Sequence, residues 1–115
     1  MKMNAAVAAL AALAHETRLN LYRTLVRRGP QGWPAGVLAE KLGIAPPILS
    51  FHAAALERAG LVERQADGRR NIYSANFKTM SEVVGFLSNE CCGDADAGCA
   101  TDCIPAATIR RRKRA

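Results

Sequence analysis

Cysteine is absent from the first ninety residues of this 115-residue chain, and its four copies then gather near the end. Histidine is almost absent as well, because His15 and His52 are the only two and both lie far from the cysteines in the sequence. No C-x-x-C pair stands in a strand-turn-helix setting, which argues against a thiol redox enzyme. A metal site built on the cysteines would have to use sulfur alone.

Long hydrophobic runs are also missing. No segment is apolar over the length that a membrane span needs. The alanine-rich stretch after Lys2 is amphipathic and continues into Glu16, unlike a secretory leader. We therefore expect a cytoplasmic protein without membrane contact, where thiols stay reduced and clustered cysteines usually serve metal or redox chemistry. No phosphate-cradling glycine loop or catalytic constellation stands out, so we expect no enzyme.

The cysteines have the spacing C-C-x6-C-x3-C, formed by Cys91, Cys92, Cys99 and Cys103. The small polar residues 93–98 can fold the later thiols back onto the adjacent pair. Thiolates are soft donors that prefer copper(I), zinc, cadmium or trivalent arsenic and antimony. Four thiolates would suit tetrahedral zinc, and three would suit pyramidal arsenite or antimonite. Adjacent cysteines differ from the C-x2-C of structural zinc sites, which favours three ligands, while simple packing of small apolar side chains stays the alternative.

Length and charge predict one small domain with a charged tail. The formal net charge is +6, and residues 110–114 (Arg-Arg-Arg-Lys-Arg) supply five of these charges, which leaves +1 (6 − 5) for the rest. A terminal basic run is most often solvated, although it can add non-specific phosphate contact. We expect residues 1–92 to form the folded domain and residues 93–115 a flexible cysteine-containing loop and basic tail.

Apolar spacing predicts helices at 3–15 and 16–28, the second with Leu19, Tyr22, Leu25 and Val26 on one face. A short helix with Val37, Leu38 and Leu42 should end at Gly43. Pro46 and Pro47 should begin the next helix, which ends near Gly60 and turns Leu49, Ala53 and Leu56 inward. Two short helices across a glycine-containing turn form a helix-turn-helix.

Strand-like segments follow at 61–65 and 69–74, joined through Ala66-Asp67-Gly68, and Asp-Gly favours a hairpin. Arg64, Arg69 and Arg70 surround this hairpin. A basic two-stranded projection beside a helix-turn-helix is typical of a wing that contacts the DNA backbone. A solvated charged face is the alternative for the arginines alone.

The last predicted helix runs from about Phe77 to Cys92, with an apolar stripe of Met80, Val83, Val84, Leu87 and Cys91. A second stripe lies on the first helix. Because so small a domain buries little surface by itself, we expect these stripes to form a homodimer interface. The predicted fold class is mainly α (α+β), a winged helix-turn-helix with a two-stranded β wing that dimerises through its first and last helices.

The segments 9–25 and 38–62 resemble the ArsR/SmtB family of metalloregulatory winged-helix repressors. The match in the second segment is specific, since these residues fall in register: Leu42-Gly43, Pro47, Ser50-x-His52, Leu56 and Ala59-Gly60-Leu61-Val62. The resemblance implies a homodimer that binds double-stranded operator DNA and releases it when a toxic metal or metalloid binds.

By the same resemblance, residues 46–59 would be the recognition helix, with Ser50 and His52 contacting DNA and Pro47 at its start. The chain departs from the family at Ala45-Pro46, where a polar pair is common, and at Phe51, where an arginine is common. These departures remove a helix-capping side chain and hydrogen-bonding groups. Phe51 would then either touch a thymine methyl group or pack locally.

The cysteines resemble those of the family's subgroup with a Cys-Cys pair at the end of the last helix and a later cysteine, whose members respond to trivalent arsenic and antimony. The cysteines that other arsenic-responsive members carry around residues 33–38 are missing here, and Glu82 and Glu90 lack the histidine partners of the zinc sensors. We expect trivalent arsenic or antimony as the inducer, bound by Cys91, Cys92 and Cys99 with Cys103 as an alternative thiol, and no organic cofactor. Redox-sensing and zinc- or cadmium-sensing repressors of the same fold are the alternatives.

Overall fold

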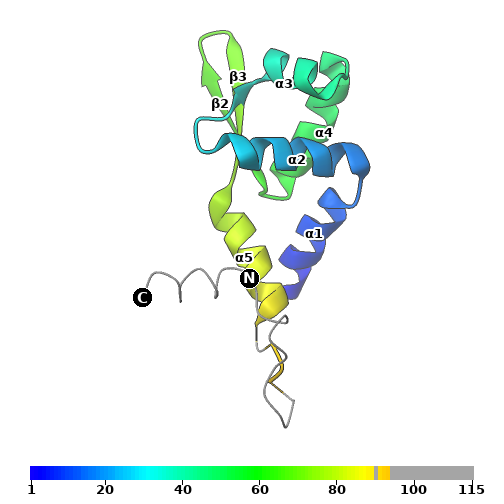
Figure 1. Cartoon of the computed structure of the whole chain (residues 1–115), viewed down its shortest axis with the longest axis vertical. Coiled ribbons are helices and arrows are strands. Elements are labelled where there is room, and N and C mark those ends of the chain that lie inside the picture. Colours follow the sequence, from blue (N-terminus) through cyan, green and yellow to red (C-terminus); the bar gives the residue numbers. More distant parts are fainter. Residues whose placement is uncertain (90, 94–115) are drawn as a thin grey trace. The chain divides into compact units, whose positions relative to one another are not determined.

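A computed structural model of the chain describes residues 1–89 and 91–93. These residues form helices and a small sheet in the order α1 (Met3–Leu13), α2 (Glu16–Arg28), β1 (Trp33–Pro34), α3 (Ala35–Leu42), α4 (Pro46–Arg58), β2 (Val62–Asp67), β3 (Arg70–Ala75) and α5 (Phe77–Ser88), as Figure 1 shows. Residues Met1–Val83 make one compact unit, and the described residues from Val84 onward belong to a second. The predicted winged helix-turn-helix architecture is confirmed.

The first two helices meet at His15, which does not belong to α1 as predicted. Helix α1 ends at Leu13, and His15 takes an extended conformation as the N-cap of α2. Its Nδ1 accepts a hydrogen bond of 3.1 Å from the backbone N–H of Thr17. An unpaired N–H of the first helical turn is thereby satisfied, which explains why the chain breaks between the helices here.

The helix-turn-helix consists of α3 and α4, and its turn follows the prediction. Gly43 ends α3 in the left-handed conformation, with φ of +67°, at little cost because it has no Cβ. Helix α4 begins at Pro46, where the missing N–H is harmless, and its N-cap Ala45 offers no side-chain hydrogen bond. Its inward face was predicted correctly, because Leu49, Ala53 and Leu56 are fully buried.

The wing is the β2–β3 hairpin of a three-stranded antiparallel sheet with the order β1-β3-β2. Asp67 pairs with Arg70, so the turn consists of Gly68 and Arg69 rather than the predicted Ala66-Asp67-Gly68. Only Gly68 of these two has a positive φ (+64°), the pattern of a type II′ turn. The short strand β1 was not predicted: Trp33 pairs with Tyr73, and Pro34 with Ile72.

The core of the first unit is built on fully buried leucines from α2, α3, α4 and the residue before β2: Leu21, Leu25, Leu38, Leu49, Leu56 and Leu61. On α2 the predicted inward position Leu19 is exposed, and Leu21 is buried in its place. Helix α1 buries Ala6, Ala9 and Ala12, because small side chains let it lie close to α2 and α4. The longer side chains of Met3, Val7 and Leu10 are exposed, whereas Leu13 at the end of the helix packs partly against the core.

Helix α5 begins after Asn76, whose Oδ1 accepts a hydrogen bond of 3.2 Å from the N–H of Thr79. Val83 is buried, whereas Val84 and Leu87 are exposed. The helix ends at Ser88, so the prediction that it continues to Cys92 is wrong. In the part of the chain that the structure describes, no helix has the length and apolar character to cross a membrane.

Candidate nucleic-acid interface and thiol site

The N-terminal half of α4 presents an exposed surface made of Pro47, Ile48, Ser50 and Phe51. Leu49 lies between them and is buried, which fixes the rotation of the helix about its axis. Ser50 places a hydroxyl group at this surface, and the Phe51 side chain is 61% exposed. The surface therefore offers one hydrogen-bonding group flanked by apolar ones, and such a surface can contact base edges and thymine methyl groups.

His52 is the fourth predicted contact on α4, and the structure places it differently from Ser50 and Phe51. It is only 8% exposed, and its Nδ1 accepts a hydrogen bond of 3.1 Å from Nε of Arg18 on α2. The His15 ring lies 4.8 Å from the His52 ring, measured between centroids. Burial lowers the pKa of His52, and the neighbouring His15 and Arg18 lower it further, so the neutral form is favoured.

Arg18 also reaches Phe51, since its guanidinium carbon lies 5.7 Å from the centre of that ring. Phe51 in turn contacts the His52 ring edge-on at 5.3 Å. Arg18 and His15 were not predicted as part of this region, because their contacts with α4 join residues far apart in the sequence. A DNA contact by His52 itself stays a prediction. In the structure, His52 and Arg18 both contact the ring of the exposed Phe51.

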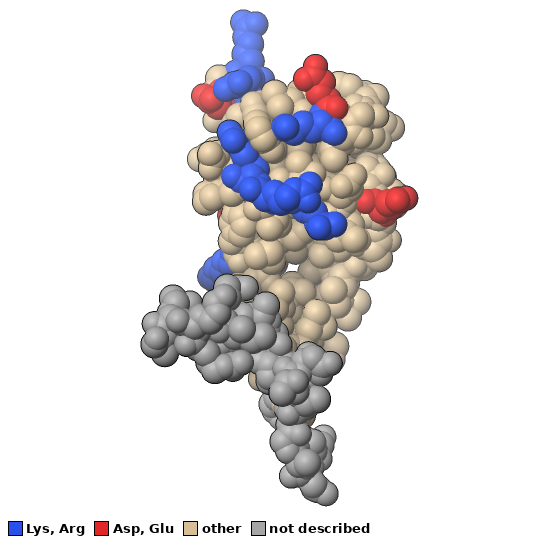
Figure 2. All heavy atoms as spheres, viewed as in Figure 1, with Lys and Arg blue, Asp and Glu red and all other residues tan. Residues whose placement is uncertain are grey.

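The wing carries the three predicted arginines on its exposed surface. Arg64 lies 3.6 Å from a carboxylate oxygen of Glu57, and Arg70 donates a hydrogen bond of 3.1 Å to Asp67. Both pairs are solvent-exposed and therefore weak, so phosphate can compete for these arginines. Arg69 occupies the turn at the tip of the hairpin. Figure 2 shows basic side chains at the top of the molecule, where Figure 1 places the hairpin.

Cys91 and Cys92 lie in a turn beyond the end of α5. The N–H of Cys91 donates a hydrogen bond of 3.0 Å to the carbonyl oxygen of Ser88, and Cys92 has a φ of +62°. Their two Sγ atoms are 3.7 Å apart, and both residues are exposed. Cys92 is disulfide-bonded in the structure. Cys99 and Cys103 lie outside the described residues.

The distance between the Cys91 and Cys92 sulfurs can be compared with the distance between two sulfurs that bind the same ion. An ion with metal–sulfur bonds of roughly 2.3 Å and bond angles of about 90° to 110° holds two sulfurs about 3.3 to 3.8 Å apart. The Cys91–Cys92 spacing fits both a pyramidal and a tetrahedral ion. Residues 1–89 and 91–93 contain no group of three or more metal-ligating side chains, so a complete site needs a thiol from elsewhere.

Comparison with known proteins places the helix-turn-helix of this chain among DNA-binding regulators. Residues 13–65 match a family described as a helix-turn-helix domain. The HTH-type transcriptional regulator YgaV of Escherichia coli (strain K12) is 31% identical over 87 residues, which cover 76% of this chain and 86% of YgaV.

Two solved structures share the fold. The transcriptional repressor BigR from Xylella fastidiosa is 28% identical, with a TM-score of 0.60 over 77% of this chain and 88% of BigR. A homodimeric winged helix-turn-helix domain from Mycobacterium bovis, described as a possible ArsR-family regulator, has a TM-score of 0.61 over 84% of this chain and 90% of that domain. Its sequence identity of 20% supports a likeness of fold only.

Proposed function

Because this chain belongs to the ArsR/SmtB family of winged-helix transcriptional regulators, we propose that it is a cytoplasmic homodimeric repressor that releases operator DNA when trivalent arsenic or antimony binds its cysteines. DNA binding and transcription regulation follow from the family. Repression, the dimer and the inducer are the proposed parts. The approach of the Cys91 and Cys92 sulfurs to 3.7 Å supports the binding of one soft ion by both residues, and the spacing of the cysteines in the sequence favours arsenic or antimony among such ions.

Two adjacent thiols with this spacing supply two bonds to one soft ion. A third bond from Cys99, or from Cys103 instead, completes a pyramidal site for As(III) or Sb(III), whose lone pair occupies the remaining direction. Arsenite arrives as As(OH)3, so each As–S bond that forms replaces an As–OH bond, and the thiol proton leaves with that hydroxyl as water. Cys92 is disulfide-bonded in the structure, so a thiol reductant must first supply two electrons and two protons to convert that disulfide to two thiols. The turn around Cys91 and Cys92 would then reorganise on binding.

The proposed homodimer rests on apolar surface that the first unit leaves uncovered. Met3, Val7 and Leu10 share one exposed face of α1, and Val7 and Leu10 are 55% and 40% exposed. Their i, i+4, i+7 spacing makes a continuous stripe, which in a small regulator fits a second copy of the same helix. The exposed Val84 and Leu87 of α5 are the other proposed contacts.

In the proposed complex, each subunit lays α4 toward a major groove and its wing along the backbone. Ser50 and Phe51 would meet base edges, while Arg64, Arg69 and Arg70 would contact phosphates. A ligand at the turn that follows α5 would change the arrangement of two α5 helices in a dimer. Because a palindromic site fixes the spacing between two recognition helices, such a change would lower affinity for DNA.

The deciding experiment is a titration of the protein, bound to fluorescently labelled DNA from upstream of its own gene, with arsenite, antimonite, zinc and cadmium in turn. The titration is run under reducing conditions. We expect arsenite and antimonite to release the DNA at near-stoichiometric concentrations. Release by zinc or cadmium alone would replace the proposed inducer, and binding of no DNA fragment would contradict the repressor itself.

A second candidate is a repressor that senses oxidation, and the disulfide-bonded Cys92 is the observation that favours it. In that case disulfide formation, rather than an ion, would change the turn after α5. Arsenite in the presence of excess reductant separates the two. A metalloid sensor still releases DNA there, whereas a redox sensor releases it only after an oxidant such as hydrogen peroxide is added.

A further inference from the structure

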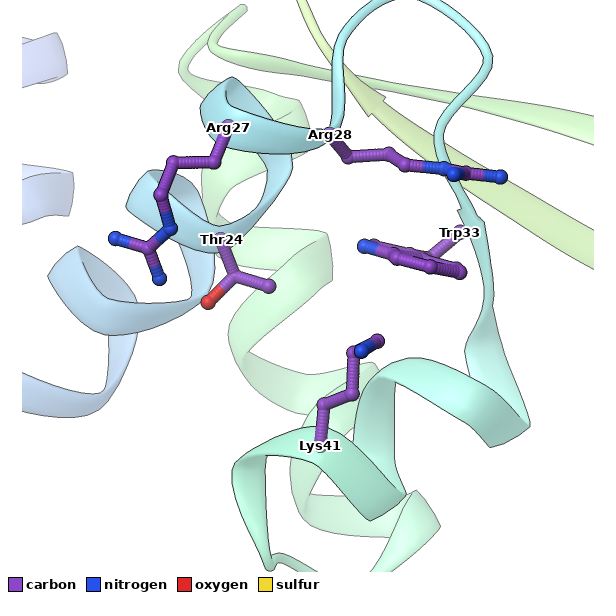
Figure 3. Close-up of a pocket in the computed structure, with 5 residues that line it drawn as sticks. All are labelled: Thr24, Arg27, Arg28, Trp33 and Lys41. Carbon is purple, nitrogen blue, oxygen red and sulfur yellow. The ribbon is translucent and has the colours of Figure 1, made fainter.

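A cationic pocket lies on the first unit where α2, β1 and α3 meet, and none of its lining residues belongs to the proposed DNA surface or to the cysteine turn. Thr24, Arg27, Arg28, Trp33 and Lys41 line a hollow of about 470 Å³. Figure 3 shows the Arg28 guanidinium on one side of the Trp33 ring and Lys41 on the other. The guanidinium carbon lies 3.9 Å, and the Lys41 ammonium nitrogen 4.5 Å, from the ring centre.

Local structure holds these groups in place. Gly32 lies against β3 so closely that an added Cβ would come within 2.2 Å of the Tyr73 carbonyl oxygen. The pairing of Trp33 with Tyr73 then fixes the indole on the sheet. Nε of Arg28 donates a hydrogen bond of 2.9 Å to the Gly32 carbonyl oxygen, which positions the guanidinium over the ring. Arg28 and Trp33 are therefore ordered before any ligand arrives, and ordering costs little on binding.

The charge of this pocket is not balanced by the protein. Among the described residues, Arg27, Arg28 and Lys41 make no ion pair, and no carboxylate lines the pocket. Each of the three stands in the last turn of its helix, where a cation complements the helix dipole. The helix dipole explains why each of these cations stands at a helix end, but it does not explain why all three line one pocket. Subtracting about half a charge for each of two helix ends leaves the pocket at roughly +2.

We infer that this pocket binds a phosphate group. Its charge of roughly +2 matches a phosphate, and arginine and lysine are the side chains that recognise phosphate oxygens. Because cations lie against both faces of Trp33, the indole supports them and does not stack on a base or another aromatic ring. The Thr24 hydroxyl donates to the Asn20 carbonyl oxygen, so binding rests on the cations.

The phosphate could come from the DNA backbone or from a free phosphorylated anion, and one reporter distinguishes these sources. Trp33 is the only tryptophan in the chain, so fluorescence excited selectively at tryptophan, and not at the two tyrosines, reports on the Trp33 ring in this pocket. The full-length protein is titrated first with inorganic phosphate and pyrophosphate at constant ionic strength set by chloride. It is then titrated with a DNA duplex. The first titration does not depend on the proposed function.

The test variant is Arg27→Gln with Lys41→Gln, which keeps Trp33 and its Arg28 contact. The matched control is Arg23→Gln with Arg58→Gln, which removes the same charge from exposed positions on α2 and α4 outside the pocket. For a free anion we expect a saturable change in emission with phosphate, about tenfold or more weaker in the test variant and unchanged in the control.

For a DNA phosphate we expect no response to the free anions. The response to the duplex should then be lost only in the test variant, with the salt slope lower by about two. No response in either titration, or an equal loss in both variants, overturns the inference. A protein that binds phosphate here but is not released from DNA by arsenite would contradict the proposed function and leave this site standing.

Discussion

The helix-turn-helix with its wing and the cysteine turn after α5 differ in how the chain specifies them. In the first region, buried leucines fix the orientation of α4 and strand pairing fixes the register of the wing, and the family match at residues 13–65 covers most of this region. The cysteine turn lies beyond that match, and the contacts described for Cys91 and Cys92 there are with residues close in the sequence. DNA binding is thus a property of a shared scaffold, whereas the proposed response to a ligand would depend on a few residues that follow this scaffold.

The largest expected effect comes from a change in the cysteine turn that leaves the DNA-binding region as it is. Replacing both Cys91 and Cys92 by Ser should abolish release of DNA by arsenite, because a hydroxyl is a hard, protonated donor that does not replace a thiolate. Affinity for DNA without arsenite should stay within about twofold, since neither residue belongs to the proposed DNA surface. Fluorescence anisotropy with labelled operator DNA measures both quantities.

Single replacements of the later cysteines refine this test. We expect Cys99→Ser to impair the response more than Cys103→Ser, because closing the shorter loop costs less entropy. If the double variant at Cys91 and Cys92 still released DNA at the arsenite concentration that acts on the wild type, the proposed site would be wrong.

A change on α1 should affect both regions together, because a dimer would connect them. Leu10→Glu places a charge in the proposed interface, and in a symmetric dimer it does so twice. Burying unpaired charge is costly, so we expect the dimer dissociation constant to rise about a hundredfold or more, with loss of tight DNA binding. Sedimentation analysis measures the association. The control Ala8→Glu changes an exposed position off the Val7–Leu10 stripe and should leave a dimer; a monomeric wild type would refute the interface.

The sequence predicted the DNA-binding region well because its signals are local. Gly43 and Pro46 set the turn between α3 and α4, and the spacing of Leu49, Ala53 and Leu56 set the inward face of α4. Leu19 was assigned wrongly because two leucines two residues apart, Leu19 and Leu21, both fit an apolar stripe, and only packing against other elements decides between them.

Features that depend on distant contacts escaped prediction. Strand β1 exists because Trp33 and Pro34 pair with β3, forty residues further along the chain. The contact of Arg18 with His52 and the stacking of Lys41 on Trp33 likewise join separate elements. The early end of α5 at Ser88 was missed because the apolar stripe continues in the sequence to Cys91, beyond the last residue of the helix.

A smaller effect is expected at the wing. Arg69→Ala together with Arg70→Ala should weaken binding to all DNA sequences alike, since these side chains are expected to contact phosphates. The slope of log affinity against log salt should fall by about one per lost contact, and the arsenite response should remain. Because Arg70 already interacts with Asp67, Arg69 should contribute the larger share. A change in sequence preference at constant slope would instead show that the wing reads bases.

The smallest expected effect concerns pH and the support of α4. The pKa of His52 is lowered in the folded protein by burial, His15 and Arg18, from an ordinary value near 6.5. The unfolded chain therefore binds more protons between the folded pKa and 6.5, so this contribution to stability is complete above about pH 6.5 and is lost as the pH falls below it. His52→Gln keeps an acceptor for Arg18 but cannot titrate. We expect the free energy of unfolding, measured by urea denaturation at pH 5.5 and 7.5, to fall less for the variant than for the wild type. Equal losses in the two proteins would mean that protonation of His52 does not change the stability of the fold, and that the buried leucines of α4 hold its exposed face in place without His52.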